Sequence, residues 1–165
     1  NDFKKKFAKQ CSTIATGSGT DSLHLAYILA GLKKGDEVIT TIFTCTATNI
    51  PMLYMGLKIK FADIDSQTWT VDPNEIDKLI DNNTVAVVAP HYAGLMCDMD
   101  SIKTVCRNKN VFLVEDACHA PLSEFDNKKL GNLNFSNCNQ KDGCVTNMIL
   151  SNNIIDLLLF VSHRW

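Results

Sequence analysis

The chain has 165 residues, of which 45% are hydrophobic and 21% are charged, values that are typical of a globular rather than a disordered protein. The formal net charge is -2, and the only basic cluster is the short run 4–6, so the sequence gives no reason to expect a nucleic-acid partner. The longest late apolar run, 157–161, is far too short to span a bilayer, and no signal peptide is visible. These features favour one domain, or part of one, without a membrane segment.

Seven cysteines are many for this length, but no two have the Cys-x-x-Cys spacing of a zinc or redox site. Their number is odd, and several lie in apolar surroundings, where a thiol behaves as a small hydrophobic side chain. We therefore expect reduced cysteines and a cytoplasmic location, because disulfides are rare in that compartment. No set of cysteine, histidine and acidic residues has metal-ligand spacing, so we predict no metal site.

Helical and strand patterns alternate along the chain from residue 20 onward. We predict helices where apolar residues recur at helical spacing, and strands where β-branched residues cluster between turn signals. The expected helices are 23–30, opened by residues 18–22, then 44–54, 73–80 with Asp72 as its N-cap, and 98–106. The expected strands are 37–41, 58–62, 70–71, 85–89 and 111–114. Strands separated by helices indicate βαβ units. The predicted fold class is therefore α/β, with three layers and a mostly parallel sheet that has helices on both faces.

The alternating pattern ends near residue 125. Residues 132–139 are rich in asparagine, and the pattern of 149–161 is compatible with a helix. An open parallel sheet needs further strands and covering helices, so we expect the chain to be part of a larger domain.

The clearest candidate site follows the last predicted strand. Apolar residues 112–114 run directly into Glu115 and Asp116, as expected when a buried parallel strand delivers an acid to the ligand-binding edge of an open α/β sheet. A buried carboxylate requires a cationic partner, because an unpaired buried charge is costly. We therefore expect Asp116 or Glu115 to bind a cation. His119 lies three residues after Asp116 and can face the same cavity.

A second candidate site precedes the first predicted helix. Residues 17–22 (GSGTDS) combine two glycines with hydroxyl and acidic capping residues. The free N–H groups of a first helical turn bind phosphate well, and glycines let a ligand approach the backbone closely. By itself the motif favours an ordinary N-cap over a phosphate site. Neither G-x-x-x-x-G-K-[ST] nor G-x-G-x-x-G occurs in the chain.

Two further segments follow predicted strand ends. Residues 43–49 (FTCTATN) offer hydroxyls and one aromatic ring to a pocket, although helix capping and packing are the better explanation for this segment alone. His91 follows the strand 85–89 and is a candidate for acid–base chemistry or substrate binding, because histidine titrates near neutral pH. A purely structural histidine is the alternative, and the position at a strand end slightly favours it.

A phosphate-binding helix start, combined with a buried carboxylate at a later strand end, suggests pyridoxal 5′-phosphate. With that combination the sequence resembles the DegT/DnrJ/EryC1/StrS family of sugar aminotransferases, which have the fold-type-I pyridoxal-phosphate architecture. Six segments match in family order and spacing between residue 13 and about residue 138. Their amino-acid sequences are most similar to the perosamine-synthase-like branch. The segments are 19–26 (GTDSLHLA), 35–40 (GDEVIT), 44–49 (TCTATN), 61–65 (FADID), 91–94 (HYAG) with 97–100 (CDMD), and 115–120 (EDACHA).

The resemblance implies that the helix start and Asp116 hold opposite ends of the cofactor. The backbone amides of Thr20 and Asp21, next to Gly19, would bind the phosphate. Asp116 would bind the ring nitrogen and keep it protonated, because a nearby anion favours the charged form. The ring can then accept electrons from the carbanion that forms at the amino-acid α-carbon.

The resemblance also implies two contacts to the ring. His119 occupies the position from which relatives contact the phenolic oxygen of the ring. Cys45 occupies the position where many relatives place an aromatic residue that stacks on the ring. A thiol cannot stack, so either Phe43 or another residue replaces it, or the ring is held loosely.

The main departure from the family pattern lies at residues 137–144 (NCNQKDGC). Relatives have a run such as Ser-Phe-Gln-Ala-Ile-Lys-His here, followed by a Gly-Asp-Gly-Gly segment, and that lysine forms the Schiff base and moves the proton. On the order of ten residues are missing from this chain by comparison. Lys141 is either the displaced counterpart of the Schiff-base lysine or a residue at a deletion junction. We favour the second interpretation, in which Lys141 has no catalytic role.

The resemblance makes residues 1–138 a partial cofactor-binding large domain, with 139–165 as a divergent tail rather than a separate domain. The implied reaction, in amino-sugar biosynthesis, moves an amino group from an amino-acid donor onto a keto-sugar nucleotide. Relatives are homodimers with shared active sites. We expect this chain, truncated or degenerate after about residue 138, to be a poor catalyst by itself.

Two alternatives stay open. One is a non-catalytic remnant or binding subunit of the same fold. The other is a pyridoxal-phosphate sugar dehydratase, in which histidine replaces the Schiff-base lysine. The absence of a histidine near Gln140 argues against the dehydratase.

Overall fold

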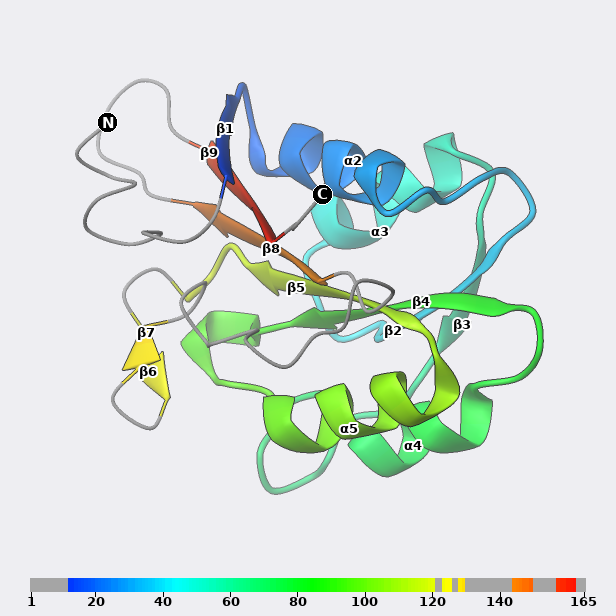
Figure 1. The fold of residues 1–165 in the computed structure, drawn as a ribbon. Coiled ribbons are helices and arrows are strands. Elements are labelled where there is room, and N and C mark those ends of the chain that lie inside the picture. Colours follow the sequence, from blue (N-terminus) through cyan, green and yellow to red (C-terminus); the bar gives the residue numbers. More distant parts are fainter. Residues whose placement is uncertain (1–11, 121–122, 126–127, 130–143, 150–156, 163–165) are drawn as a thin grey trace.

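The computed structural model describes residues 12–120, 123–125, 128–129, 144–149 and 157–162 (Figure 1). The helices are α2 (Gly19–Leu29), α3 (Thr46–Tyr54), α4 (Pro73–Leu79) and α5 (Met99–Lys109), with a 3-10 turn, η1 (Tyr92–Gly94). The strands are β1 (Ser12–Thr16), β2 (Glu37–Thr40), β3 (Lys58–Phe61), β4 (Thr84–Pro90), β5 (Phe112–Ala117), β6 (Glu124–Phe125), β7 (Lys128–Lys129), β8 (Cys144–Ile149) and β9 (Leu157–Ser162).

Seven strands form one sheet in the order β1-β9-β8-β5-β4-β2-β3, and β6 pairs with β7 in a separate antiparallel ribbon. Strands β3, β2, β4, β5 and β8 are parallel neighbours, whereas β9 runs antiparallel to both β8 and β1. The first described strand therefore lies beside the last one (Figure 1). The parallel pairing places the carboxyl ends of β2, β4 and β5 at one edge, as predicted for a mostly parallel sheet.

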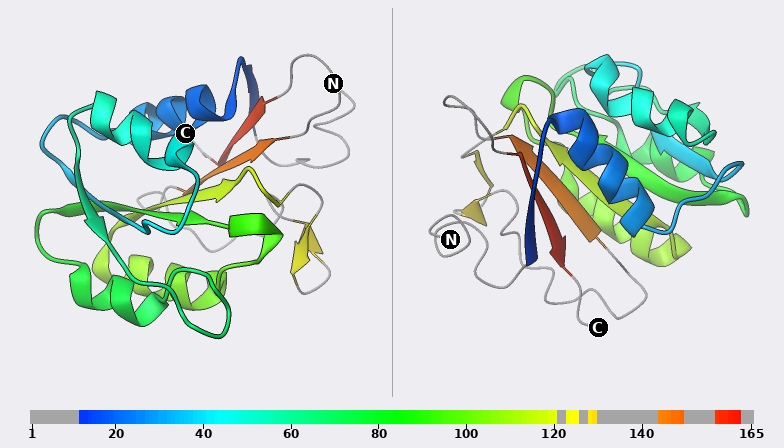
Figure 2. Two further views of the ribbon diagram at one scale, coloured as in Figure 1. Left: turned by 180° about the vertical axis from the view of Figure 1, so that it is seen from behind. Right: turned by 90° about the horizontal axis from the view of Figure 1, so that it is seen from above.

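Helices cover both faces of the sheet, which confirms the predicted three-layer α/β architecture. Helices α2 and α3 pack side by side on one face, and α4 and α5 pack on the other (Figures 1 and 2). Each face has its own apolar core, because neighbouring strand residues point to opposite sides. Val88 and Val114 pack beneath α2 and α3, whereas Val87 and Leu113 pack against the layer of α4 and α5.

Capping residues mark the starts of α4 and α5 and the end of α2, whereas α3 begins at Thr46 rather than at the expected residue 44, without a side-chain cap. Asp72 accepts a hydrogen bond from the amide of Asn74, and Pro73 follows at the first helical position. Asp98 caps α5 in the same way, through the amide of Ser101. Gly31, with φ of 77°, ends α2, because this left-handed conformation favours glycine.

The structure corrects the expectation of a helix over 149–161. Strand β8 ends at Ile149 and strand β9 covers Leu157–Ser162 instead. Strand β9 pairs on both sides, with β1 and β8, so its backbone hydrogen bonds run to strands that are distant in the sequence. A continuous apolar run such as 157–161 is typical of an interior strand, and periodicity alone does not distinguish it from a buried helix segment.

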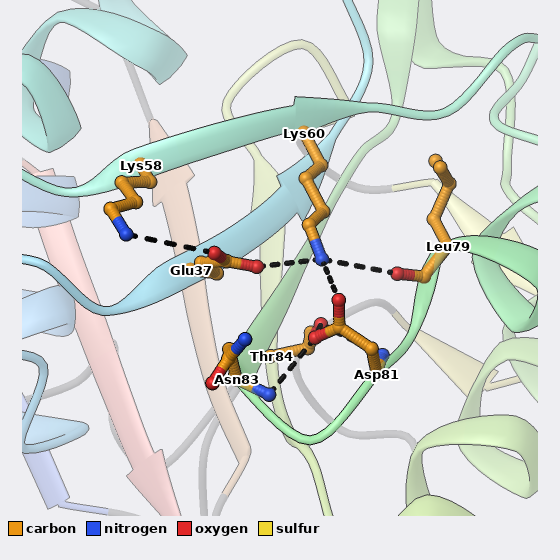
Figure 3. Close-up of polar contacts among 7 residues, drawn as sticks. All are labelled: Glu37, Lys58, Lys60, Leu79, Asp81, Asn83 and Thr84. Carbon is orange, nitrogen blue, oxygen red and sulfur yellow. Dashed lines mark hydrogen bonds and ion pairs between the residues drawn. The ribbon is translucent and has the colours of Figure 1, made fainter.

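A cluster of charges joins the amino ends of three strands, at the opposite edge from the carboxyl ends (Figure 3). The Lys60 Nζ atom on β3 lies 2.6 Å from a carboxylate oxygen of Glu37 on β2 and 2.6 Å from one of Asp81, just before β4. Lys58 makes a longer contact of 3.8 Å with Glu37. These ion pairs bridge strands β2, β3 and β4 and leave the other edge of the sheet for ligands.

Three expectations from the sequence concern disulfides, membrane-spanning helices and metal sites, and they can be compared with the described residues. Cys45, Cys97, Cys106 and Cys118 are thiols rather than disulfides. Among the described residues, no helix combines the length and the apolar character that crossing a bilayer requires. Within the same residues, no group of three or more His, Cys, Asp and Glu side chains is placed to hold a metal ion.

Candidate functional site

A cavity of about 230 Å³ opens at the carboxyl ends of β4 and β5, between the first turns of α2 and α3. It is lined by Gly19, Thr20, Leu23, Cys45, Ala47, Thr48, Pro90, His91, Tyr92, Asp116, Cys118 and His119. The cavity brings together six residues that the sequence analysis singled out, from segments that are far apart in the chain. Asp21 is exposed and does not line the cavity, and Lys141 lies outside the described residues.

Asp116 is the central acid of the cavity. It sits on β5, and only 5% of its surface is exposed. The hydroxyl of Thr48 donates to Oδ2 at 2.8 Å, and the amide of Cys118 donates to Oδ1 at 3.1 Å. Both partners are donors, which fits an ionised carboxylate. No lysine, arginine or histidine in the described part of the chain forms an ion pair with Asp116, so the site offers a buried anion to a cationic ligand.

Glu115 points to the other face of the sheet and has a protein partner. Its Oε1 atom lies 2.9 Å from Nε2 of His91, and both side chains are fully buried. The amide of Cys97 donates to Nδ1 of His91 at 3.1 Å, so Nδ1 carries no proton in this geometry. Nε2 is then the donor to Glu115. With both ring nitrogens engaged, the geometry favours a structural role for His91 over substrate binding.

The first turn of α2 forms the opposite end of the cavity. Ser18 is the N-cap, and its side chain accepts a hydrogen bond of 3.1 Å from the amide of Asp21. The amide of Thr20 makes no hydrogen bond with another described residue and lies at the positive end of the helix dipole. The geometry therefore supports Gly19 and Thr20 as the anion-binding backbone more strongly than Asp21, whose amide is already engaged.

Aromatic rings line the entrance of the cavity. The centroid of the Tyr92 ring lies 5.8 Å from that of His119 and 4.6 Å from that of Phe43. The Phe43 ring also packs against Trp69, with centroids 5.9 Å apart. Tyr92 and His119 line the cavity, whereas Phe43 packs against Tyr92 and is not among the described lining residues. Cys45, the N-cap of α3, and Cys118, just after β5, are the two thiols among the described lining residues.

Thr48 and Tyr27 are parts of the site that the sequence analysis did not assign. Thr48 lies in the first turn of α3 and contacts Asp116, as described above. The hydroxyl of Tyr27, on α2, donates to the carbonyl oxygen of Thr48 at 2.9 Å. Burial raises the pKa of Tyr27 well above its usual value, and the nearby Asp116 and Cys118 raise it further, so the phenol stays protonated and able to donate. The hydroxyl-rich segment 43–49 was the available signal for Thr48.

Comparisons with known proteins identify the family to which this chain is similar. The profile of the DegT/DnrJ/EryC1/StrS aminotransferase family matches residues 1–140. An uncharacterised protein of Methanocaldococcus jannaschii is 38% identical over 133 residues, a match that covers 81% of this chain and 33% of that protein. GDP-perosamine synthase of Caulobacter vibrioides is 36% identical over 135 residues, covering 80% of this chain and 36% of the synthase.

The fold agrees with solved structures as well. The crystal structure of 3-amino-5-hydroxybenzoic acid synthase superimposes with a TM-score of 0.81 and 25% identity, covering 98% of this chain and 41% of that one. The chain spans about a third of the length of the curated relatives that it matches. Enzymes of this family use pyridoxal 5′-phosphate as their cofactor. The family match extends over most of the sequence, and the chain therefore belongs to the DegT/DnrJ/EryC1/StrS aminotransferase family.

Proposed function

We propose that this chain forms the cofactor-binding part of a pyridoxal-phosphate-dependent aminotransferase that acts on a keto-sugar nucleotide. One observation carries the proposal: the buried carboxylate of Asp116 has two donors and no cation among the described residues, and it shares a cavity with the helix start at Gly19 and Thr20. A ligand that joins a cationic ring to an anionic ester suits both ends. Membership of the DegT/DnrJ/EryC1/StrS family supplies the reaction class.

The described residues fit the two ends of the cofactor. The amides of Gly19 and Thr20 would hold the phosphate, helped by the dipole of the 11-residue helix α2. Asp116 would accept a hydrogen bond from the protonated ring nitrogen and preserve its charge. When bound, the cofactor supplies an electron sink for the substrate carbanion. The role of the chain is thus to orient the ring and to keep its nitrogen protonated.

Two further residues complete the proposed contacts to the ring. His119 would donate to the phenolic oxygen, since its Nδ1 accepts a 3.4 Å hydrogen bond from the amide of Ala93, which leaves Nε2 to face the ligand. Tyr92 is the cavity aromatic nearest to His119 and can contact the ring where Cys45 cannot stack.

We propose that Lys141 is a junction residue and that the chain alone transaminates poorly. The proposal rests on the sequence of 137–144, which lacks the segment that carries the lysine in relatives. Incubation with pyridoxal 5′-phosphate, borohydride reduction and peptide mass mapping tests it. We expect no reduced adduct at Lys141. A stoichiometric adduct there would refute the impairment and identify Lys141 as the cofactor lysine.

The names of relatives support the proposed substrate and assembly. One relative is a GDP-perosamine synthase, whose name describes the synthesis of a GDP-linked sugar. We propose a keto-sugar nucleotide as acceptor, an amino acid as donor and a homodimer as the assembly. A sugar nucleotide is anionic, and the described lining residues include no lysine or arginine, so we propose that residues other than these bind its diphosphate.

Replacement of Asp116 by asparagine tests the cofactor site. The probe is pyridoxamine 5′-phosphate, which has no aldehyde and so binds without a lysine. Breaking a buried ion pair costs about 3–5 kcal/mol, so we expect Asp116→Asn to weaken binding by roughly a hundredfold or more in a fluorescence titration. Asp100→Asn, an exposed carboxylate in the first turn of α5, is the matched control and should bind normally. Equal affinity of the two variants would contradict the proposed site.

A further inference from the structure

Two threonine hydroxyls and the Asp116 carboxylate form a chain of hydrogen bonds in which each donor can be assigned. The Oγ1 atoms of Thr44 and Thr48 lie 3.0 Å apart, and Thr48 Oγ1 lies 2.8 Å from Asp116 Oδ2. A carboxylate only accepts, so the single proton of the Thr48 hydroxyl points at Asp116. The Thr48 oxygen is then an acceptor, and Thr44 must be its donor. Each hydroxyl in the chain therefore has one defined orientation.

The backbone of Thr48 is also held in place. The Tyr27 phenol donates to its carbonyl oxygen at 2.9 Å, and the Thr48 amide donates to the carbonyl of Cys45 at 3.0 Å. Tyr27 is completely buried, and Thr48 is 2% exposed. Helices α2 and α3 thus fix the position from which the hydroxyl reaches the carboxylate on β5.

From this geometry we propose that Thr48 is a positioning residue for Asp116, and that the hydroxyl chain from Thr44 sets the orientation in which the carboxylate meets the cofactor ring. The inference rests on the proposed function, because it assigns a role toward the same ring. The amide of Cys118 holds Oδ1 and the hydroxyl of Thr48 holds Oδ2, so the two donors together prevent rotation of the carboxylate plane. With the Thr48 donor removed, only the amide of Cys118 restricts rotation about the last side-chain bond.

The test compares three threonine variants. Thr48→Val keeps the size of the side chain and removes the donor, whereas Thr48→Ser restores a hydroxyl. Thr40→Val is the matched control, because Thr40 is equally buried and its hydroxyl has no hydrogen-bond partner among the described residues. Because hydrogen bonds to charged groups are strong, we expect Thr48→Val to weaken pyridoxamine 5′-phosphate binding about tenfold, equivalent to about 1.4 kcal/mol. Thr48→Ser and Thr40→Val should bind within about twofold of the parent chain.

A spectroscopic readout separates positioning from a general loss of structure. Pyridoxamine 5′-phosphate labelled with 15N in the ring reports whether the bound ring nitrogen is protonated. We expect the nitrogen resonance to move toward the neutral form in Thr48→Val and to return in Thr48→Ser. A purely structural role for Thr48 would leave the resonance of the bound ring unchanged. Equal resonances in Thr48→Val and Thr40→Val would overturn the inference.

Other outcomes are equally decisive. If Thr48→Val does not fold, Thr44→Val decides, since it removes only the donor to Thr48: a smaller shift in the same direction supports the inference, and an unchanged resonance overturns it. If the unsubstituted chain binds no pyridoxamine 5′-phosphate, the proposed function fails and this inference fails with it. If Asp116→Asn abolishes binding and Thr48→Val does not alter it, only this inference fails.

Discussion

Two neighbouring carboxylates on β5 have different roles because of the pleat of the strand. Successive side chains point to opposite faces, so Asp116 shares the face of Val114 and helices α2 and α3, and Glu115 shares that of Leu113. Glu115 binds a protein group, His91, whereas Asp116 binds only neutral donors among the described residues. Only Asp116 can therefore bind an external cation without the loss of the buried contact between His91 and Glu115.

The contact between His91 and Glu115 predicts a structural effect of substitution at His91. His91→Leu keeps a similar volume and removes the buried imidazole that donates to Glu115. Removing one partner of a buried charged contact is strongly destabilising, so we expect the free energy of unfolding to fall by about 3–5 kcal/mol in urea titrations. His24→Leu, a half-buried histidine on α2, should change it by less than about 1 kcal/mol. Similar stability of the two variants would argue that His91 serves the ligand rather than the fold.

At the level of single residues, the sequence predicted Asp116 and the start of α2 as parts of the site. It did not predict the residues that hold the two carboxylates of β5 in place. The order of apolar and acidic residues around Asp116 reflects local strand structure, which short segments encode. The choice between Asp116 and Glu115 required the location of His91, which is 24 residues from Glu115 in the chain. The contact from Thr48 spans 68 residues. Such contacts depend on tertiary packing, which no local pattern contains.

Among the elements, the helices and the parallel strands β2, β3, β4 and β5 were predictable because their patterns are local, whereas β1 and β8 were not expected and the expected strand 70–71 forms only an isolated bridge. Met99, Ile102 and Cys106 are all buried on one side of α5, as their spacing predicts. The strand β9 was not predictable in this way. Its partners are β1, at the other end of the described chain, and β8, and their pairing takes precedence over the helical pattern of 149–161.

The charge cluster at the amino ends of β2, β3 and β4 predicts a dependence of stability on pH. The hydrogen bond from Lys60 lowers the pKa of Asp81 from 3.8 to about 2, with a further contribution from the amide of Asn83 (Figure 3). A carboxyl whose pKa is lower in the folded state than in the unfolded state stabilises the fold at pH values above its unfolded-state pKa. That stability is lost as the pH falls from 3.8 to about 2.

Replacement of Lys60 by methionine tests the origin of this dependence. We expect the free energy of unfolding to depend less steeply on pH in Lys60→Met than in the parent chain over the same acidic window, as measured by urea unfolding. Lys78→Met is the control, because Lys78 pairs with Glu75 on α4 and does not contact Asp81. The explanation is wrong if Lys60→Met and Lys78→Met lose stability equally with acid.

For the whole molecule, exposed apolar side chains are distributed unequally between the two helical layers. Ile28 and Leu29 on α2 and Leu53 and Tyr54 on α3 are exposed, whereas no large apolar side chain of α4 or α5 is. Leu53 is 62% exposed and Tyr54 is 76% exposed. Apolar side chains that gather on one layer indicate an interaction surface. The proposed homodimer would bury this layer, which Figure 2 shows on a single face of the sheet.

The double replacement Leu53→Glu and Tyr54→Glu tests whether this layer forms the dimer. In a symmetric dimer each substitution occurs twice, so four carboxylates would enter the contact, and each unpaired buried charge is costly. We expect the parent chain to sediment as a dimer and the double variant as a monomer with unchanged circular dichroism. Arg107→Glu, an exposed position on α5, should remain dimeric. If the parent chain is monomeric at every concentration, or if Arg107→Glu dissociates as readily as the double variant, the layer of α2 and α3 is not the interface.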